Sequence, residues 1–405
     1  MKIMFLTQYF PPEVGAPQNR IFELAKLLVN RGHEVTVLTG MPCYPANEIF
    51  DGYKGKLLMK EEIDGVKVVR TWLYATKNPG FIPRLMNYFS FTFSSLFIGT
   101  FSVAKQDVVI TESPPLFLGM SGYLISILKR AKFIFNVSDL WPESAVKLGV
   151  LNNKQLIKLS TWLEEFCYKK SALILGQTKG IIDNINQRGY DNTYLLTNGV
   201  DTSFFNKDKA NNELRNQLKL QEKFLVCYAG IIGIAQGLDL ILDCAEKLKD
   251  NKDVHFLLIG EGPEKQRLIK KAENLSLENI SFVPLQPKEK MPGVIAAMDA
   301  TIIPLKNLDL FKGALPSKMF EALASELPII LSVDGEAKKL IEASGGGITV
   351  EPENVEQVTK AILKLYEDTD FAKKLGENGR AFVKEHYARE IIAQKFEEKL
   401  LSLKK

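Results

Sequence analysis

The chain has 405 residues, of which 46% are hydrophobic and 25% are charged, and its formal net charge at pH 7 is +4. This length exceeds one ordinary hydrophobic core, so two or three globular domains are expected. The small net charge, without a run rich in arginine and lysine, argues against a nucleic-acid partner. It still allows a weak preference for an anionic membrane surface.

The cysteines and the N-terminus bear on the cellular compartment. Cys43, Cys167, Cys227 and Cys244 are far apart and form no CxxC pair, which favours a reduced, cytoplasmic compartment. Cys43 falls in an expected loop and could be exposed, whereas Cys227 sits in an apolar strand pattern. The apolar start of the chain turns polar at Thr7, too soon for a signal peptide, so it predicts a first buried strand.

Strand and helix signals alternate along the first half of the chain. A loop rich in proline and glycine, at 11–17, follows the first strand, and a helix at 18–30 ends at Arg31-Gly32. Runs of β-branched residues bounded by turns and interleaved with helices predict a parallel sheet covered on both faces. The expected strands are 3–7, 33–39, 66–71, 107–111, 132–138 and 172–178.

The segment 85–104 carries no charge and is long enough to span a bilayer. It is only moderately apolar, because it contains Asn87, several serines and two threonines. A buried or interfacial amphipathic helix is therefore expected in preference to a membrane span. Arg84 at its start and Lys77 nearby would suit an edge that faces lipid headgroups.

The second half repeats the alternating pattern after a polar stretch, which places a domain boundary near residue 200. Expected strands are 224–229, 254–259, 280–283, 300–304 and 327–332, and expected helices are 238–249, 263–274 and 288–298. Three helical stretches close the chain, at 355–368, 371–385 and 388–403. The last has an apolar face without an obvious partner in its own domain.

These elements predict an α/β protein of two doubly wound parallel-sheet domains, whose strand carboxyl ends face a shared ligand cleft. A dinucleotide-binding dehydrogenase would need G-x-G-x-x-G directly after a strand, and neither candidate loop has it. Gly230, Gly233 and Gly237, after the strand expected at 224–229, would still let the backbone approach a phosphate. A turn of this kind is also a common structural device.

The stretch 313–321, GALPSKMFE, combines a glycine-bearing loop with the start of a helix. Pro316 suits the first helical position, and the free N–H groups of a helix start favour an anion. Lys318 adds a cation in the first turn, and Glu321 lies on roughly the same face. A cation for phosphate beside a carboxylate for sugar hydroxyls suits a nucleotide-sugar site. The alternative is an amphipathic helix with two solvated charges.

In their order and spacing, these segments resemble the retaining GT-B glycosyltransferases of family 4 over nearly the whole chain. The subgroup they resemble most builds bacterial O-antigen and capsule repeat units and includes proteins assigned as L-fucosamine transferases. The matching segments are PPEVGAPQNR, RGHEVTVLTG, NVSDLWPES, TNGVDTSFF, YAGIIGIAQGLD, LLIGEGPEKQRL, FVPLQPKEKMPGVIAAMDATIIPL, PSKMFEALASELPII and LGENGRAFVKEHY.

The resemblance implies Mg²⁺-independent transfer of a sugar, with retention at the anomeric carbon. Residues 1–200 would bind the acceptor, 201–387 would bind the nucleotide sugar, and a last helix at 388–405 would pack back onto the first domain. The implied donor is a UDP-sugar, such as one carrying an N-acetylated amino sugar like L-FucNAc. The implied acceptor is a polyprenyl-diphosphate saccharide at the inner membrane surface, and no cofactor is expected.

The resemblance also assigns site residues, with departures from the family pattern. Glu321 matches the second glutamate of an E-x7-E motif whose first position is Gly313 here. The two phosphate-binding cations of the family fall at Ile231 and Gln236, so Lys318 and the glycine backbone must stabilise the leaving diphosphate. The implied donor contacts are Gly230, Gly233, Gln236, Gly260, Glu261, Leu285, Pro316, Ser317, Lys318, Glu321 and Asn198.

In the first half, Gly15, Ala16 and Arg20 form the implied acceptor and phosphate loop, although Gly15 and Ala16 fit a plain helix start as well. Asp139 ends a buried strand where relatives carry a histidine, so it joins Lys318 and Glu321 as a catalytic candidate. Its alternative role is to cap the following helix. His33, His255 and His386 have no metal or triad spacing, so no metal site is expected.

Two rival functions stay open at this point. A UDP-sugar 2-epimerase also uses two such domains, but would interconvert free UDP-sugars without an acceptor. An inactive partner subunit would keep the fold, and the replacements at Gly313, Ile231 and Gln236 favour that idea.

Overall fold

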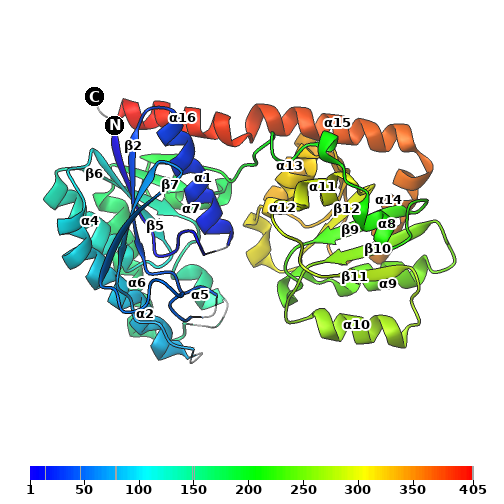
Figure 1. Cartoon of the computed structure of the whole chain (residues 1–405), viewed down its shortest axis with the longest axis horizontal. Helices are drawn as coiled ribbons and strands as arrows, with labels where there is room; N and C mark the ends of the chain where they lie inside the picture. The colour runs from blue at the N-terminus through cyan, green and yellow to red at the C-terminus, as the bar shows by residue number, and fades with distance from the viewer. Residues whose placement is uncertain (14, 46, 78–79, 148, 150, 404–405) are drawn as a thin grey trace. The chain divides into compact units, whose positions relative to one another are not determined.

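The computed structural model describes residues 1–13, 15–45, 47–77, 80–147, 149 and 151–403. The chain forms two compact units (Figure 1), of which the first consists of Met1–Thr197 and Ala393–Lys405 and the second of Asn198–Ile392. The last helix, α16 (Arg389–Ser402), therefore begins in the second unit and ends in the first.

The first unit is built on a sheet with the strand order β3-β4-β2-β1-β5-β6-β7-β8. The pairings are parallel except for that between β3 and β4. The strands β3 and β8 were not expected from the sequence, because neither has an apolar run. The strands are β1 (Lys2–Leu6), β2 (Glu34–Gly40), β3 (Leu58–Ile63), β4 (Val66–Thr71), β5 (Val108–Ser113), β6 (Lys132–Val137), β7 (Leu173–Gly176) and β8 (Thr193–Leu195).

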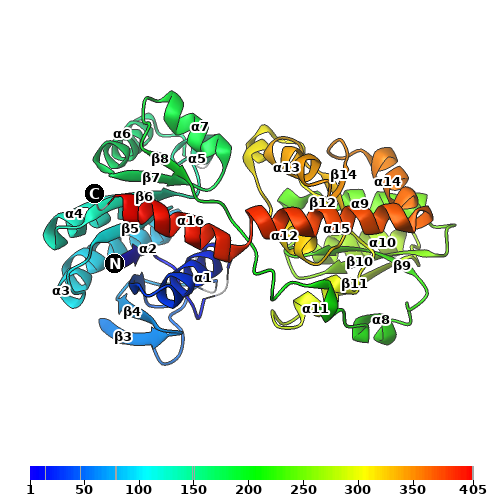
Figure 2. The ribbon, with the colours of Figure 1, turned by 90° about the horizontal axis from the view of Figure 1, so that it is seen from above.

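Helices cover both faces of this sheet. Helix α1 (Ala16–Asn30) follows β1, and α16 runs beside it (Figure 2), where Glu397 accepts hydrogen bonds from Arg31 and lies 2.7 Å from His33 Nε2. Phe396 of α16 is fully buried, with its ring centroid 6.1 Å from that of Tyr194. The other helices of this unit are α2 (Phe81–Ser94), α3 (Thr100–Ser102), α4 (Leu118–Lys129), α5 (Glu143–Lys147), α6 (Lys154–Lys170) and α7 (Lys179–Gln187).

The second unit has a six-stranded sheet with the order β11-β10-β9-β12-β13-β14 and parallel pairings. Strand β14 was not expected from the sequence. The strands are β9 (Phe224–Ala229), β10 (Val254–Ile259), β11 (Ile280–Val283), β12 (Ala300–Pro304), β13 (Ile329–Ser332) and β14 (Gly347–Thr349).

Alternate side chains of these strands enter two separate cores, as the period of two in a strand requires. Cys227 and Leu257 face a core with α11, α12, α13 and α15, whereas Val226 and Phe256 face one with α9, α10 and α14. The helices of this unit are α8 (Glu213–Gln217), α9 (Asp239–Lys247), α10 (Lys265–Asn274), α11 (Met291–Ala296), α12 (Ser317–Ala324), α13 (Glu336–Ser344), α14 (Val355–Glu367) and α15 (Thr369–His386).

Both sheets are therefore doubly wound, which confirms the predicted fold class. In the first unit the strand order reverses at β1 and β5, and in the second unit at β9 and β12. Open sheets of this kind bind ligands outside the carboxyl ends of the strands at such a reversal. The two reversals are thus the expected ligand sites of the two units.

The uncharged segment 85–104 forms the end of α2, a π-helical turn η1 (Ser95–Gly99) and α3. Among the helices of the described residues, none has the length and apolarity needed to cross a bilayer. One further expectation is corrected: Cys43 is buried, at 1% exposure, because the loop that carries it packs into the core with Met4 and Leu38.

Candidate functional site

The predicted donor residues gather at the carboxyl-terminal edge of the second sheet. Strands β9, β10, β11 and β12 run parallel, so the loops that follow them share that edge. The loops after β9 and β12 meet directly, because the Lys306 N–H donates to the carbonyl of Ala235 at 3.0 Å. This contact lies at the reversal of strand order, where a ligand site is expected.

Two glycine turns bring the ends of β9 and β10 into close contact. The Gly230 N–H donates to Ile259 O at 2.9 Å, and the Ile232 N–H donates to Glu261 O at 2.9 Å. Gly230 and Gly260 have φ of 144° and 149°, which L-residues with side chains rarely adopt. A Cβ at Gly260 would overlap the carbonyl oxygen of Gly230. Glycine is thus required at Gly260 by the approach of the two backbones and at Gly230 by its φ.

Helix α12 places Lys318 directly over the first glycine turn. The helix begins at Ser317, one residue later than expected, so that Pro316 is its N-cap. Lys318 Nζ lies 3.8 Å from the ring centroid of Tyr228, and a Cβ on Gly230 would lie 2.9 Å from the same nitrogen. The Tyr228 hydroxyl donates to Ile231 O at 2.6 Å, so its ring supports both the lysine and the turn.

The electrostatics of Lys318 and Glu321 are set mainly by burial. Burial lowers the pKa of Lys318 to about 8, opposed by the nearby Glu321 carboxylate. Burial raises the pKa of Glu321 to about 7, opposed by the positive charges of Arg389, Lys318 and Lys288. Both groups thus change protonation close to neutral pH, and an anion at this site would favour the charged lysine.

The remaining donor candidates line the same edge with differing exposure. Glu261 forms an ion pair of 2.6 Å with Lys265, so its carboxylate already has a partner. Leu285, after β11, is 65% exposed, and Ile231, at the expected cation position, is 67% exposed. Gln236 lies in a 3-10 turn, with its Oε1 2.8 Å from the position of a Cβ on Gly233.

Ser317 is exposed at the start of α12, and Asn198 is the first residue of the second unit. Gly313 ends the 3-10 segment η4 (Asp309–Gly313), and a Cβ there would meet nothing within 4 Å. There is therefore open space beside Gly313, the position at which the family pattern has a glutamate.

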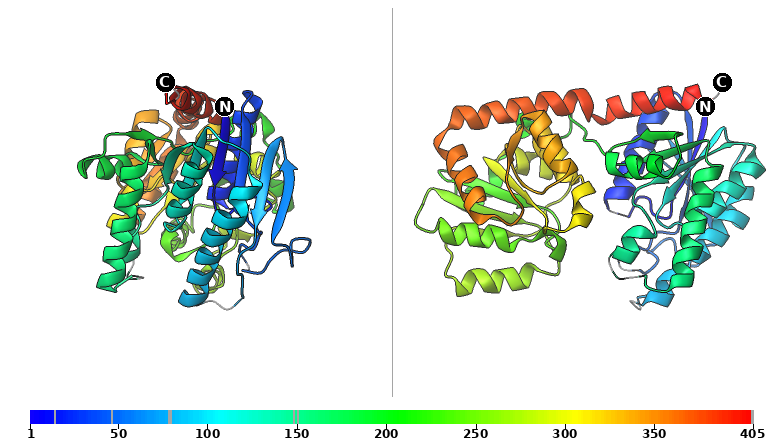
Figure 3. Two further views of the ribbon diagram at one scale, coloured as in Figure 1. Left: turned by 90° about the vertical axis from the view of Figure 1, so that its left-hand side faces the viewer. Right: turned by 180° about the vertical axis from the view of Figure 1, so that it is seen from behind.

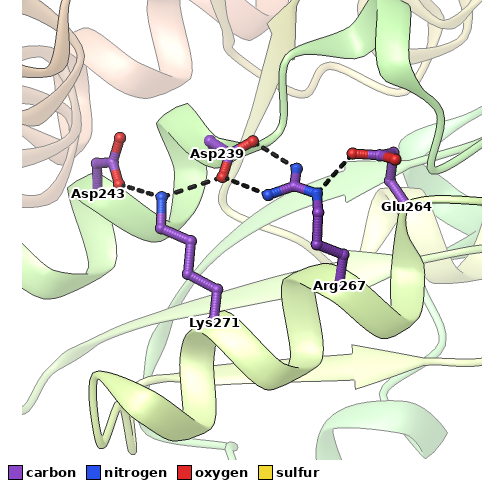
Figure 4. A network of polar contacts seen from close by, with 5 residues as sticks. All are labelled: Asp239, Asp243, Glu264, Arg267 and Lys271. Carbon is purple, nitrogen blue, oxygen red and sulfur yellow. Dashed lines mark hydrogen bonds and ion pairs between the residues drawn. The ribbon is translucent and has the colours of Figure 1, made fainter.

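A network of ion pairs holds the two helices that follow the glycine turns (Figure 4). Asp239, at the start of α9, contacts Arg267 at 2.6 Å and Lys271 at 3.0 Å, both on α10. Arg267 also contacts Glu264 at 2.7 Å, and Lys271 contacts Asp243 at 2.7 Å. Hydrogen bonds from Arg267 and Lys271 lower the pKa of Asp239 to about 2. The network therefore fixes the spacing of the helices that carry the turns.

In the first unit, Gly15 is the N-cap of α1 and Ala16 its first residue. Gly15 has φ of 179°, an extended conformation open to any residue, so this glycine is not required by backbone strain. Arg20 points into its own unit, where Nη2 contacts Glu112 Oε1 at 2.6 Å and Ser138 Oγ at 2.9 Å. Its charge is thus already balanced by a buried carboxylate.

Asp139 lies just beyond β6 and is exposed. Partial burial of its carboxyl group raises the pKa of Asp139. Hydrogen bonds from the Ser144 hydroxyl and the Leu140 backbone oppose this rise. These bonds to the start of α5 match the helix-capping role that was the alternative for this residue. The next aromatic residue, Trp141, has its ring centroid 6.2 Å from that of Phe117.

Four polar residues at these two edges were missed from the sequence. Tyr228 and Arg389 shape the surroundings of Lys318 and Glu321. In the first unit, buried Glu13 accepts backbone N–H groups of Phe10, Cys43 and Tyr44, and buried Arg70 donates to the Pro11 and Gly40 carbonyls. In the sequence, these four residues stand out only by lying near expected turns. Their roles depend on contacts with residues that are distant in the chain.

Two family models match the chain. Residues 15–199 match the glycosyl transferase 4-like domain, and residues 210–382 match glycosyl transferases group 1. The first match covers most of the first unit and ends two residues into the second, and the second match falls within the second unit.

Comparison with known proteins gives relatives of the full length. A protein of Escherichia coli K12, provisionally named the colanic acid biosynthesis glycosyl transferase WcaI, is 28% identical over 97% of this chain and 99% of its own. Among solved structures, sucrose-phosphate synthase from Thermosynechococcus elongatus aligns with a TM-score of 0.76 at 16% identity, over 99% of this chain and 98% of its own. Alr3699/HepE from Anabaena, in complex with UDP and glucose, gives 0.73 at 18% identity, over 99% and 100%. The structural likeness shows that the fold is GT-B.

Proposed function

Because this chain is a glycosyltransferase, with a 4-like domain followed by a group 1 domain, we propose that it moves a sugar from a UDP-sugar to a lipid-linked acceptor with retention at the anomeric carbon. The second unit would bind the donor, and the first unit the acceptor. The transferred sugar would be an N-acetylated amino sugar such as L-FucNAc.

The observation that carries this proposal is the half-buried pair Lys318 and Glu321 on one turn of α12, beside the Gly230 turn. A diphosphate seated between this turn and the start of α12 would meet Lys318 Nζ and free backbone N–H groups. Glu321, one turn further, would accept hydrogen bonds from ribose hydroxyls. The similar Anabaena protein was solved in complex with UDP and glucose, which supports a uridine nucleotide here.

The proposed chemistry uses no enzyme nucleophile. The bond between the anomeric carbon and the diphosphate oxygen would break, and the acceptor oxygen would attack from the same face. The departing phosphate oxygen would take the acceptor's proton, so charge and atoms balance within donor and acceptor. The protein would supply positioning and positive potential, chiefly from Lys318. No divalent metal is needed for this route, so activity should survive removal of metals with EDTA.

The acceptor is proposed as a polyprenyl-diphosphate saccharide at the cytoplasmic surface of the inner membrane. Support comes from the name of the relative that is 28% identical, which refers to the biosynthesis of a polysaccharide, colanic acid. The product would be a unit of an O-antigen, capsule or related polysaccharide.

Donor binding is tested first, by calorimetric titration of the full chain with UDP, GDP, dTDP and a panel of their sugars. One UDP-sugar should stand out. Glu321→Ala should weaken UDP binding by about 10- to 100-fold, as loss of a charged hydrogen-bond partner does. The matched control is Glu377→Ala, since Glu377 is an exposed glutamate of the same unit. No binding of any nucleotide, or equal loss in the control, would contradict the donor site.

Incubation of the chosen donor alone, followed by NMR, separates transfer from epimerisation. A transferase leaves the donor sugar unchanged without acceptor, whereas a UDP-sugar 2-epimerase isomerises it. With acceptor present, the anomeric coupling of the product reports retention or inversion. A Glu321→Ala variant that complements a deletion strain as well as the parent chain would instead support an inactive partner subunit.

A further inference from the structure

One layer of helices in the first unit presents a row of phenylalanines to solvent. In α2, the π-helical turn and α3, Asn87, Ser94 and Ser95 are buried, whereas Phe93, Phe97 and Phe101 are 59%, 63% and 86% exposed. A surface helix in water normally turns its apolar side to the core. Here Asn87, Ser94 and Ser95 face the core together with Phe91, and a row of other phenylalanines faces outward.

The inward polar groups have specific partners, so this orientation is fixed. Asn87 accepts a hydrogen bond from Gln8 and donates to Tyr74 O at 2.6 Å. Ser94 Oγ lies 3.0 Å from Thr71 Oγ1, and Ser95 Oγ lies 3.0 Å from Ser121 Oγ. Rotating the helix to bury the phenylalanines would break these bonds inside the protein, which is costly.

The π-helical turn extends the outward row. Phe89, Phe93, Phe97 and Phe101 are spaced by four residues, a spacing that drifts around an ordinary helix of 3.6 residues per turn. In the π-helical turn at Ser95–Gly99, backbone hydrogen bonds join residues i and i+5, so one turn contains more residues than a turn of α-helix. This larger turn offsets the drift. The exposed phenylalanines thereby stay on one side.

The neighbouring helices continue this surface, with α4 in contact with α2, η1 and α6 (Figure 3, left). Ile127 and Leu128 of α4 are 53% and 63% exposed, and Trp162 of α6 is 55% exposed. We define the apolar helical face as Phe93, Phe97, Phe101, Ile127, Leu128 and Trp162. Large exposed apolar side chains gathered on adjacent helices are typical of a site of protein or membrane contact.

The segments that contain α2, α3 and α4 have basic residues but no acidic ones. Residues 65–106 and 113–138 contain no aspartate or glutamate, whereas Arg84, Lys105 and Arg130 are exposed there. The acidic residues of α6, Glu164 and Glu165, are both paired with Arg188 of the following helix–strand connection. An apolar surface with exposed basic charges beside it complements an anionic bilayer.

We propose that the apolar helical face seats the first unit on an anionic lipid bilayer, with the phenylalanine row inserted at the headgroup boundary. The choice of a bilayer over another partner rests on the proposed function, whose lipid-linked acceptor resides in a membrane. The ring contact of Phe89 with Phe117, at 4.4 Å between centroids, continues from this face toward Trp141 and the loop after β6. The face therefore connects with the carboxyl-terminal edge of the first sheet, where an acceptor is proposed to bind.

The test is sedimentation of the full chain with vesicles of phosphatidylcholine alone or mixed with phosphatidylglycerol. The unaltered chain should sediment with mixed vesicles, and less so at high salt. Phe93→Ser, Phe97→Ser and Phe101→Ser together should lower the bound fraction by about tenfold or more, because less apolar area is buried in lipid. Arg84→Gln, Lys105→Gln and Arg130→Gln together should remove the preference for phosphatidylglycerol.

The matched control replaces exposed apolar residues elsewhere in the same unit, Leu57→Ser, Leu58→Ser and Leu195→Ser, and should bind vesicles as the unaltered chain does. UDP binding by calorimetry should be equal in all variants, which checks folding and separates this inference from the donor site. Failure of the unaltered chain to sediment, or equal binding by the phenylalanine variant, would overturn the proposal. So would a dimer in sedimentation velocity that the phenylalanine variant abolishes, because a second copy would then cover the face.

Discussion

Lys318 and Glu321 stand one helical turn apart, and their pKa values of about 8 and about 7 lie close to neutrality. If a diphosphate binds Lys318 and a ribose binds Glu321, both side chains must be charged for tight binding. UDP affinity should therefore be highest between about pH 7 and pH 8, weakening below as Glu321 gains a proton and above as Lys318 loses one. Calorimetry across this range measures the profile.

Two variants test which side chain causes the acid limb and which causes the alkaline limb of the pH profile of UDP affinity. Lys318→Arg should remove the alkaline limb, since a guanidinium stays protonated. Glu321→Gln should weaken binding and remove the acid limb. A profile that is flat in the unaltered chain, or limbs that both persist in the variants, would show that these side chains do not contact the nucleotide.

The raised pKa of Glu321 also predicts a dependence of stability on pH without ligand. Its ordinary value is 4.5, so between about pH 4.5 and pH 7 the folded state holds a proton that the unfolded state has lost. The stabilisation from that proton is present at low pH and is lost as pH rises through this window. Denaturant unfolding should therefore show a decline in the unaltered chain that is smaller in Glu321→Gln. Identical declines would place the carboxylate in contact with water.

At the scale of elements, the glycine turns after β9 and β10 are the least replaceable parts of the candidate site. Gly260→Ala puts a Cβ against the Gly230 carbonyl at a φ of 149°, so it should destabilise the second unit by about 2 kcal/mol or more. Gly313→Ala meets open space and should change stability by less than about 0.5 kcal/mol. Denaturant unfolding of the two variants compares them directly.

The consequence for binding follows from the same geometry. Since the two turns shape the place proposed for the diphosphate beside Lys318, Gly260→Ala should also weaken UDP binding, whereas Gly313→Ala should not. If Gly260→Ala folded and bound UDP as the unaltered chain does, the close approach of the two turns would be unnecessary for the site.

At the scale of the whole molecule, the chain's last helix completes the first unit. Phe396 is fully buried against that unit, whereas Leu401 on the same helix is 44% exposed. Phe396→Ala should lower the free energy of unfolding by about 3–5 kcal/mol, because it opens a cavity in a packed core. Leu401→Ala should cost less than about 1 kcal/mol.

Thermal unfolding with and without UDP locates that effect. UDP should stabilise the transition of the second unit, and Phe396→Ala should lower the transition of the first. If Phe396→Ala changed neither transition, the helix would contribute nothing to the first unit.

The sequence by itself determined the alternation of strands and helices, because apolar runs and glycine or proline breaks act locally. Strands β9, β10, β11 and β12 have the predicted bounds, and the doubly wound class follows from them. Edge strands such as β3 and β14 were not predicted, since they lack an apolar run and are held by a neighbouring strand. The candidate pair Lys318 and Glu321 was visible for the same local reason: both lie within one helical turn.

Only the tertiary structure decided what surrounds these residues. It brought Tyr228 beneath Lys318 and tied Arg20 to Glu112, contacts between positions about ninety residues apart in sequence. It also placed Asn87 and Ser94 of α2 inward beside Phe91 and left Phe93 outward. Helical periodicity cannot settle this, because it defines two faces without stating which meets the core. Partners distant in the chain fix burial, charge and orientation, and they become known only when the fold brings them together.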